Sequence, residues 1–376
     1  MAQIEPRYPN TIGSNESWPM QRGNNSNSGY TENNSPKTKP SEKWVFKPGL
    51  GPGFGVHRLA AANGIVVSGS LDGNVIALDM SSGKQRWFYK IEEDTNQNYS
   101  TFSYPTFLGS TVFIGTFDHG NDSFDKYLYA IDIVSGQKKW KSQIIGGVEG
   151  SPKVHDGNIY FGSTKGYLYS INAANGQENW KVTVGDKFFS SVAINLDNII
   201  IRSKNYVYSF NISTGVKNWS KYIGYSPFSC PVINNNTVLV VGFKSLYAFD
   251  INSGAEKWSF QTDNNNSFSY INSPAVAYGT VYFVDLSNTL YAVDINTGVR
   301  KWKFAVQNNN VSGSEPVVAN GLVYFGVDYE GVFAIDAYTG TEKWKFEANN
   351  CLIDDEFVIS NGILYFNDGE NIKALK

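Results

Sequence analysis

Acidic side chains supply most of the groups that could do chemistry in this 376-residue sequence. One set lies in the segment TFDHGNDSFDKY (116–127), where Asp118, Asp122 and Asp125 could offer carboxylate oxygens to a cation such as Ca²⁺. Their spacing does not match the EF-hand loop. A solvated acidic loop is the alternative that these residues leave open.

A second set consists of charged and amide residues that stand at the start of short, mostly apolar stretches. Its members are Arg58, Glu149, Asn272, Glu315, Asp354, Asp355 and Glu356. If the stretches are strands that begin side by side, these side chains converge, and converging oxygens could bind a cation or a polar ligand. A hydrated charged rim is the alternative.

The familiar catalytic and metal-binding motifs are absent. Cys230 and Cys351 form no C-x-x-C pair, and the three histidines share no motif with a nucleophile or a metal ligand. The sequence contains neither G-x-S-x-G nor H-E-x-x-H. A net charge of −3 without a basic run argues against a nucleic-acid partner. No run of apolar residues is long enough to span a membrane.

The elements that must position these residues are marked by a recurring tryptophan. The recurring residues are Trp44, Trp87, Trp140, Trp180, Trp219, Trp258, Trp302 and Trp344. Before each of the last seven, an Asp or Asn stands eight residues upstream and a Gly four residues upstream, as in Asp79, Gly83 and Trp87. A fixed period near 40 residues indicates a repeat architecture.

The chemistry of one repeat is readable from its residues. LYAVD (290–294) alternates apolar and polar positions like a half-buried strand, and DINTG (294–298) has the Asp and Gly of a tight turn. KWKF (301–304) is the return strand, and INSPAVAYGTVYFVD (271–285) gives two more strands. Each repeat is therefore predicted to be a four-stranded antiparallel meander, which is a propeller blade. We name its strands A to D from the inside outwards.

The first and last repeats are complementary fragments. Counting C strands gives eight, the last being NIKALK (371–376), and no D strand follows it. SEKWVFK (41–47) carries the docking Trp of a D strand without the strands that should precede it. We expect residues 42–47 to complete the last blade, because closing the ring removes an exposed sheet edge. The predicted fold is all-β: an eight-bladed β-propeller of four-stranded antiparallel blades.

The pattern Ala-x-Asp-x-x-x-Gly-x-x-x-Trp, as in ALDMSSGKQRW (77–87), resembles the tryptophan-docking repeat of the PQQ-like eight-bladed propellers over about residues 41–376. The resemblance implies that each docking Trp packs against a neighbouring blade. Residues 17–30 resemble the leader that precedes the first blade in many secreted members, so we expect them to lie over the propeller. Two repeats depart from the pattern: Ser170 and Ser209 replace Ala, and Asn172 and Asn211 replace Asp.

The resemblance also sets requirements for catalysis. Quinoprotein dehydrogenases of this fold are longer and hold the quinone between a Trp and a vicinal disulfide, with Ca²⁺ above the channel. Here Cys230 and Cys351 are not adjacent, and every Trp except Trp18 belongs to the docking pattern. The chain therefore resembles the non-catalytic members, such as the outer-membrane assembly lipoprotein, although it lacks the lipobox Cys of that lipoprotein. We expect no PQQ and no other cofactor, and Ca²⁺ binding stays open.

These observations predict a leader (residues 1–40, partly flexible) and one propeller (41–376). The expected function is a non-enzymatic, monomeric scaffold that binds a protein, peptide or ligand in the periplasm, at the cell surface or outside the cell, although no export signal is visible. The D–A loops vary most and define the expected binding face, which we call the long-loop face; they are 92–102, 262–272, 307–313 and 348–356. A PQQ- or metal-dependent oxidoreductase and a glycan-binding propeller are the alternatives.

Overall fold

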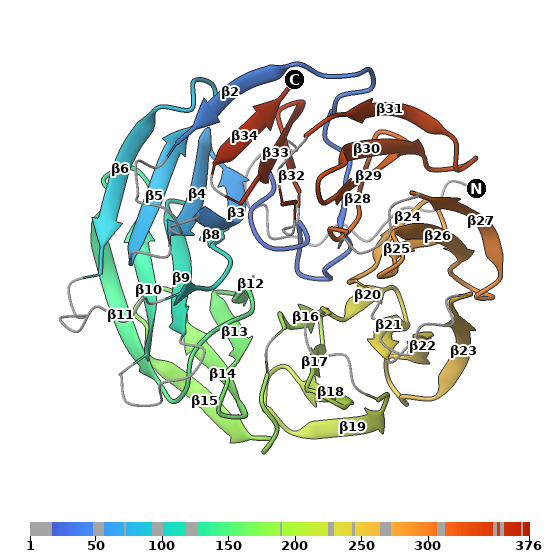
Figure 1. Cartoon of the computed structure of the whole chain (residues 1–376). Coiled ribbons are helices and arrows are strands. Elements are labelled where there is room, and N and C mark those ends of the chain that lie inside the picture. The colour runs from blue at the N-terminus through green and yellow to red at the C-terminus, as the bar shows by residue number, and fades with distance from the viewer. Residues whose placement is uncertain are drawn as a thin grey trace.

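The computed structural model describes residues 17–47, 56–70, 73–91, 101–117, 126–188, 190–224, 229–242, 245–263, 272–306, 313–348, 352–353, 357–369 and 371–376. These residues form eight sheets of mainly antiparallel strands arranged in a ring, as Figure 1 shows. The prediction of an eight-bladed, all-β propeller is confirmed. The division at residue 40, with a partly flexible leader, stays a prediction.

The first four blades follow the chain in order from the inner to the outer strand. Blade 1 contains β3 (Val56–Ala62), β4 (Ile65–Ser70), β5 (Asn74–Asp79) and β6 (Gln85–Lys90). Blade 2 contains β7 (Thr101–Phe102), β8 (Thr106–Leu108), β9 (Thr111–Phe117), β10 (Lys126–Asp132) and β11 (Lys138–Ile144). Blade 3 contains β12 (Lys153–His155), β13 (Asn158–Gly162), β14 (Tyr167–Asn172) and β15 (Glu178–Thr183). Blade 4 contains β16 (Ala193–Ile194), β17 (Asn198–Arg202), β18 (Tyr206–Asn211) and β19 (Lys217–Tyr222).

The remaining blades repeat this order, except that the last one takes its outer strand from the front of the chain. Blade 5 contains β20 (Val232–Asn234), β21 (Thr237–Gly242), β22 (Ser245–Asp250) and β23 (Glu256–Gln261). Blade 6 contains β24 (Ala275–Ala277), β25 (Thr280–Val284), β26 (Thr289–Asp294) and β27 (Arg300–Ala305). Blade 7 contains β28 (Val317–Ala319), β29 (Leu322–Val327), β30 (Gly331–Asp336) and β31 (Glu342–Phe346), with β1 (Tyr30–Thr31) parallel to β28. Blade 8 contains β32 (Val358–Ser360), β33 (Ile363–Asn367), β34 (Ile372–Leu375) and β2 (Glu42–Phe46).

The repeated Asp and Gly build the C–D turn. In blade 1, Asp79 Oδ1 accepts the backbone N–H groups of Ser81 (3.0 Å) and Ser82 (2.9 Å). Gly83 has φ +70°, and a Cβ there would lie 2.6 Å from the ring of Trp44. Glycine is therefore required both by the backbone conformation and by the close approach of the indole.

The docking tryptophans join each blade to the next. The ring of Trp87 lies against Gly136 of blade 2, and its indole N–H donates to the carbonyl of Ile133 at 2.8 Å. Trp258 makes the same contact with blade 6, donating to Ile295 at 2.9 Å. A buried aromatic ring with a satisfied polar edge fixes the position of one blade on the next.

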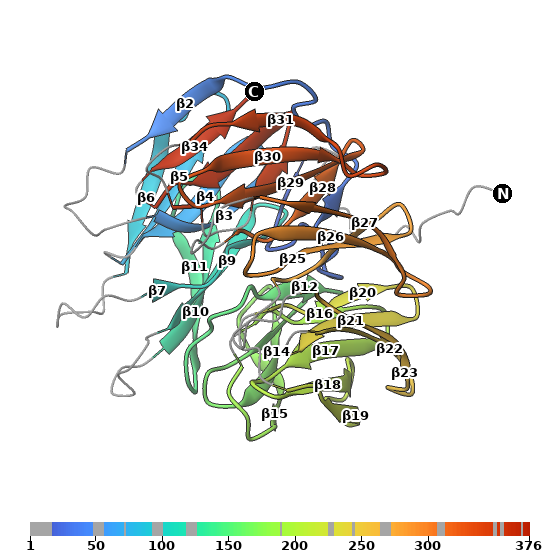
Figure 2. The ribbon, with the colours of Figure 1, turned by 45° about the vertical axis from the view of Figure 1, so that its right-hand side comes forward.

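The closure of the ring follows the sequence prediction. β2 pairs with β34 in an antiparallel ladder in which Trp44 is opposite Ala374. Ser41 and Lys376 exchange backbone hydrogen bonds of 3.0 and 2.9 Å. Figures 1 and 2 both show β2 beside β34, near the C-terminus. The front of the propeller thus covers the sheet edge that the last repeat leaves open.

Candidate functional site

The leader crosses the middle of the ring and binds the backbone of the inner strands. Figure 1 shows this segment in dark blue, inside the circle of blades. Trp18 exchanges two backbone hydrogen bonds with Ala61 of blade 1, at 2.7 and 2.8 Å. Further along, the leader carbonyls accept N–H groups from blades 2, 4, 5, 6 and 7; the donors are Phe107, Ile194, Ile233, Val276 and Val318. The leader therefore lies over the A–B end of the central channel.

Leader side chains satisfy the polar groups of the inner strands. Arg22 is fully buried and donates to the carbonyls of Pro274 (2.7 Å) and Pro316 (3.0 Å). Its guanidinium also lies 3.3 Å from Oε2 of Glu315. Asn27 is equally buried, and its amide donates to the carbonyls of Val192 (3.0 Å) and Pro231 (2.9 Å). The leader is thus tied to blades 4 to 7 by buried hydrogen bonds.

The leader also replaces a turn that blade 8 lacks. The carbonyl of Ala337 in blade 7 accepts Trp302 Nε1 (3.2 Å) and the hydroxyl of Tyr282 (3.0 Å) from blade 6. At the next junction, Pro36 of the leader accepts Trp344 Nε1 (3.2 Å) and the hydroxyl of Tyr324 (2.9 Å). The carbonyl of Pro36 therefore takes the place of the C–D turn that blade 8 lacks. In the sequence, the only sign of this substitution is that the last repeat ends before its C–D turn.

The structure brings two of the predicted site residues together on blades 1 to 3. A β-bulge between His57 and Leu59 places Arg58 at φ +65°. Its guanidinium donates to the carbonyl of Glu149 at 2.8 Å and lies 3.8 Å from the carboxylate of the same residue. It also lies over the rings of Tyr104 and Phe117, 5.2 and 4.7 Å from their centroids. Arg58 thus reaches past blade 2 to blade 3.

The electrostatic environment of Glu149 is unusual for a glutamate. Burial raises the pKa of its carboxyl to about 7, and the positive charge of Arg58 opposes that rise. Such a group can gain or lose a proton near neutral pH. Among the residues that the structure describes, its cationic partner is Arg58, and it belongs to no group of three or more potential metal ligands.

Asn272 and Glu315 lie on blades 6 and 7, in a separate group. The amide of Asn272 donates to the carbonyl of Gly313, and the hydroxyl of Ser273 donates to the carboxylate of Glu315. Glu315 in turn faces Arg22 of the leader. In this group the carboxylate holds the leader in place, which sequence reasoning missed because the two residues are 293 positions apart.

Several predicted residues fall outside the described part of the chain. They are Asp118, Asp122, Asp125, Asp354, Asp355 and Glu356. Across the described residues, no three His, Cys, Asp or Glu side chains are grouped so that they could hold a metal ion. The candidate Ca²⁺ loop and the acidic start of blade 8 stay predictions.

Cys230 is not arranged as a nucleophile. Its side chain is buried, and burial together with the negative charge of Glu315 raises the pKa of the thiol to about 11. The thiolate is the reactive form of cysteine, so this residue is inert near neutral pH.

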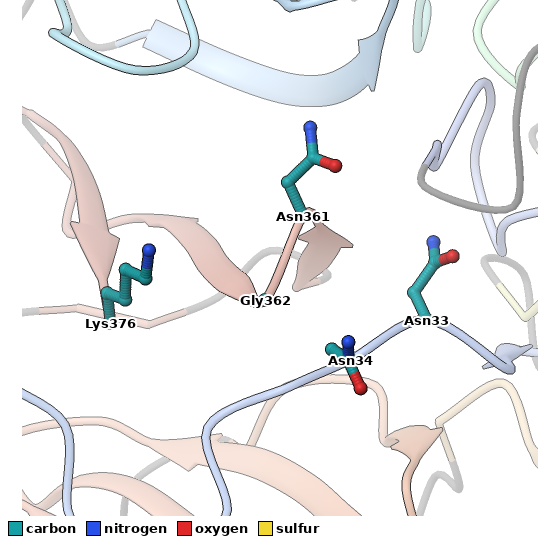
Figure 3. Close-up of a pocket in the computed structure, with 5 residues that line it drawn as sticks. All are labelled: Asn33, Asn34, Asn361, Gly362 and Lys376. Atoms are coloured by element: carbon teal, nitrogen blue, oxygen red, sulfur yellow. The ribbon is translucent and has the colours of Figure 1, made fainter.

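A polar pocket of about 320 Å³ lies between the leader and blade 8. Figure 3 shows its lining residues, which are Asn33, Asn34, Asn361, Gly362 and Lys376. Amides and an ammonium group can bind a small polar molecule through hydrogen bonds.

The quinone that gives this fold family its name does not fit the described residues of the channel. Leader residues Gln21 and Arg22 are buried among the inner strands, where a channel-bound cofactor would have to lie. Seven of the docking tryptophans, from Trp44 to Trp302, lie against the turn glycine of a neighbouring blade, and Cys230 is a free thiol. We therefore derive no reaction step through PQQ.

Comparison with solved structures places the chain among eight-bladed propellers. BamB from Moraxella catarrhalis superposes with a TM-score of 0.71 at 12% identity, covering 90% of this chain and 99% of that one. The computationally designed Ika8 protein gives 0.72 at 15% identity, over 89% and 99% of the two chains. Quinohemoprotein alcohol dehydrogenase from Comamonas testosteroni gives 0.75 at 11% identity, over 96% and 80%. At these identities the likeness shows the fold alone.

Comparison by sequence identifies the family of the chain. No curated protein matches the chain. Within the described part of the chain, no helix has the length and apolar character needed to span a bilayer. The profile of the family described as outer membrane protein assembly factor BamB matches residues 41–227 and 203–348, which is most of the propeller. The chain therefore belongs to this PQQ-like propeller family.

Proposed function

We propose that this protein is a non-enzymatic scaffold that binds a protein or peptide partner through the long-loop face of its propeller. The observation that carries the proposal is the path of the leader, which binds the inner strands at the A–B end of the channel. That end is occupied by the leader, so we place the partner on the opposite, long-loop face; most residues of its loops 92–102, 262–272, 307–313 and 348–356 lie outside the described part of the chain. Binding surfaces in rigid scaffolds usually lie on such loops.

The cell envelope is the location that the family supports. The matching profile is described as an outer membrane assembly factor, and BamB is among the similar structures. We propose that this chain works in the same kind of compartment, in the periplasm or at the cell surface. A monomeric propeller is sufficient for this role, because the ring is closed within one chain.

A pair of exposed tyrosines on blade 4 marks part of the proposed binding face. Tyr206 begins β18 and Tyr222 ends β19, so both lie at the long-loop end of the blade. Their rings meet edge to face with centroids 5.3 Å apart, and Tyr222 is 69% exposed. Tyrosines of this kind present apolar area with a polar edge, which suits a protein interface.

A matched pair of variants tests the choice of face. Tyr338 is 66% exposed but lies beyond β30, in a C–D turn on the opposite face. Crosslinking of envelope partners to the wild type is compared with that to Tyr222→Ser and Tyr338→Ser. The proposal expects Tyr222→Ser to lose crosslinked partner and Tyr338→Ser to retain it. Equal loss in both variants, or loss in Tyr338→Ser alone, would contradict the assignment of the binding face.

Two rival functions have their own tests. An oxidoreductase should bind PQQ with Ca²⁺, shift the absorbance of the quinone and oxidise alcohols with a dye acceptor; these results would overturn the scaffold proposal. A glycan-binding propeller would use exposed rings such as Tyr222 for sugar stacking. A glycan array on which wild type binds and Tyr222→Ser does not would favour that function over a protein scaffold.

A further inference from the structure

Arg202 lies in an unusual position at the junction of blades 4 and 5. It ends β17, where it is two residues after Ile200 and therefore on the same face of the sheet. Ile200 packs in a cluster with residues of blade 5 such as Ile233. Arg202 faces blade 5 as well, because its Nη1 donates to the hydroxyl of Ser229, just ahead of β20. The side chain is fully buried.

One edge of this guanidinium has no partner. Within the part of the chain that the structure describes, Nε and Nη2 of Arg202 make no hydrogen bond, although both are buried. These two nitrogens form the side edge of the guanidinium, whose parallel N–H groups match the two oxygens of a carboxylate. The unused donors therefore form a complete fork.

No acid within the described residues neutralises Arg202. Asp186, an acid of the same blade, accepts the hydroxyls of Ser203 (3.0 Å) and Tyr208 (2.7 Å) instead. Burial lowers the pKa of Arg202 to about 9, because removal from water disfavours the charged form of the guanidinium. A water molecule could accept one or both N–H groups but could not neutralise the charge.

Two other buried cationic side chains, those of Arg22 and Lys153, have hydrogen-bond acceptors within the same chain. Arg22 has two carbonyls and Glu315. Lys153 is equally buried, and its ammonium donates to the carbonyls of Gln21 and Asn24. Keeping a buried charge without a neutralising partner is strongly destabilising, so a position that does so calls for a reason beyond packing.

We propose that the Nε–Nη2 edge of Arg202 binds a small carboxylate between blades 4 and 5. The ligand carries one negative charge, because the site offers one positive charge. It is small, on the scale of formate or acetate, because the guanidinium has no solvent-exposed surface. The two carboxylate oxygens accept from Nε and Nη2, while the hydroxyl of Ser229 keeps its contact with Nη1. This site is separate from the face proposed for partner binding.

Thermal unfolding with different anions tests the site. The reference buffer contains only bulky anions, and formate, acetate or chloride is then added at constant ionic strength. The proposal expects the Tm of the wild type to rise by several degrees with formate and to saturate, less with acetate, and least with chloride. Chloride lacks the paired oxygens, so a response to chloride equal to that to formate overturns the assignment of a carboxylate.

Two variants distinguish a specific site from a general salt effect. Arg202→Met removes the fork and should lose the formate response, while being at least as stable as the wild type in the reference buffer. Arg86→Met, which changes an exposed arginine paired with Asp79, should keep the full response. If all three proteins respond alike, the anion acts on the whole surface and the proposal fails. It also fails if the wild type shows no response and Arg202→Met is less stable, because Arg202 is then structural.

A second measurement does not depend on stability. The Nε–H of Arg202 should be visible in ¹H–¹⁵N spectra because it is shielded from exchange, and formate should shift this resonance in proportion to occupancy. The assignment is made by its loss in Arg202→Met. A resonance that does not move up to high formate concentration would overturn the proposal.

Discussion

Arg22 and Arg202 are both fully buried, yet their surroundings are opposite. Arg22 of the leader donates hydrogen bonds to two carbonyls and forms an ion pair with a carboxylate, so groups of the same chain compensate its charge. Arg202 extends from a strand into a blade junction and is bonded to one hydroxyl. The first arrangement fixes a segment in place, and the second leaves a charge for a ligand to neutralise. Burial alone therefore does not distinguish a structural arginine from a binding one; its partners do.

The largest effect is expected where a compensated charge is broken. Arg22→Met removes the cationic partner of Glu315 and a donor to the carbonyls of Pro274 and Pro316. Removing one partner of a buried ion pair typically costs about 3–5 kcal/mol. Denaturant unfolding should show a loss of this size. Arg86→Met is the control, because its exposed pair with Asp79 should contribute at most about 1 kcal/mol.

If Arg22→Met were as stable as the wild type, the distinction between the two arginines would disappear. The leader would then be held by its backbone hydrogen bonds and its other side-chain contacts, such as those of Asn27. Arg202→Met should not share this loss, since no carboxylate within the described residues is paired with Arg202. A similar loss in both variants would therefore break the comparison at its centre.

Glu149 is an intermediate case, because Arg58 compensates its buried charge only in part. Its folded pKa is raised from 4.5 to about 7, so the unfolded carboxyl ionises first as the pH rises. The stability linked to this group is fully present below pH 4.5 and is lost between pH 4.5 and 7. The shift corresponds to about 3 kcal/mol.

Unfolding measured across this pH range tests the shift. Glu149→Gln should remove the part of the slope that belongs to this carboxyl. The wild type should therefore lose stability relative to the variant as the pH rises from 4.5 to 7. Parallel curves for the two proteins would mean that Arg58 already compensates the charge in full.

The sequence predicted the features that depend on contacts repeated in every blade. Gly83 and Trp44 show why: the same turn and the same indole contact recur, so a fixed spacing reveals them. The closure by Trp44 and Ala374 followed from counting strands. The contacts of Arg22 and Arg58 occur once each and join residues that are far apart in the chain. A single sequence holds no signal for contacts of that kind.

Arg202 shows the same limit within a blade. In the sequence it reads as the polar end of the strand NIIIR (198–202), next to a turn, where an arginine is unremarkable. Its burial results from the approach of blade 5 at Ser229, and its missing partner is visible only when all neighbours are in place. The candidate carboxylates were selected instead because they stand at the start of the predicted inner strands.

A smaller effect should reveal how well the leader substitutes for a turn. Trp344→Phe removes a hydrogen bond to Pro36 of the leader, and Trp258→Phe removes the equivalent bond to Ile295 of a blade. Each bond contributes roughly 1 kcal/mol, and both variants remove the same atoms from the indole ring. Equal losses in denaturant unfolding would show that the leader carbonyl is a full replacement. A loss for Trp258→Phe alone would mean that Pro36 holds the indole weakly.

The smallest effect is expected at the exposed charges of the C–D turns, which give the lower limit of the comparison. The backbone N–H of Ser135 and the ammonium of Lys139 lower the pKa of Asp132 to about 2. Blade 3 has Asn172 and Asn179 at the matching positions, where Asn179 bonds to Ser170 instead of forming an ion pair. The double change Asp132→Asn with Lys139→Asn should therefore cost less than about 1 kcal/mol and reduce the salt dependence of unfolding. Solvent screening should weaken this exposed pair. A cost as large as that of Arg22→Met would therefore show that exposure does not determine how much a charged pair stabilises this propeller.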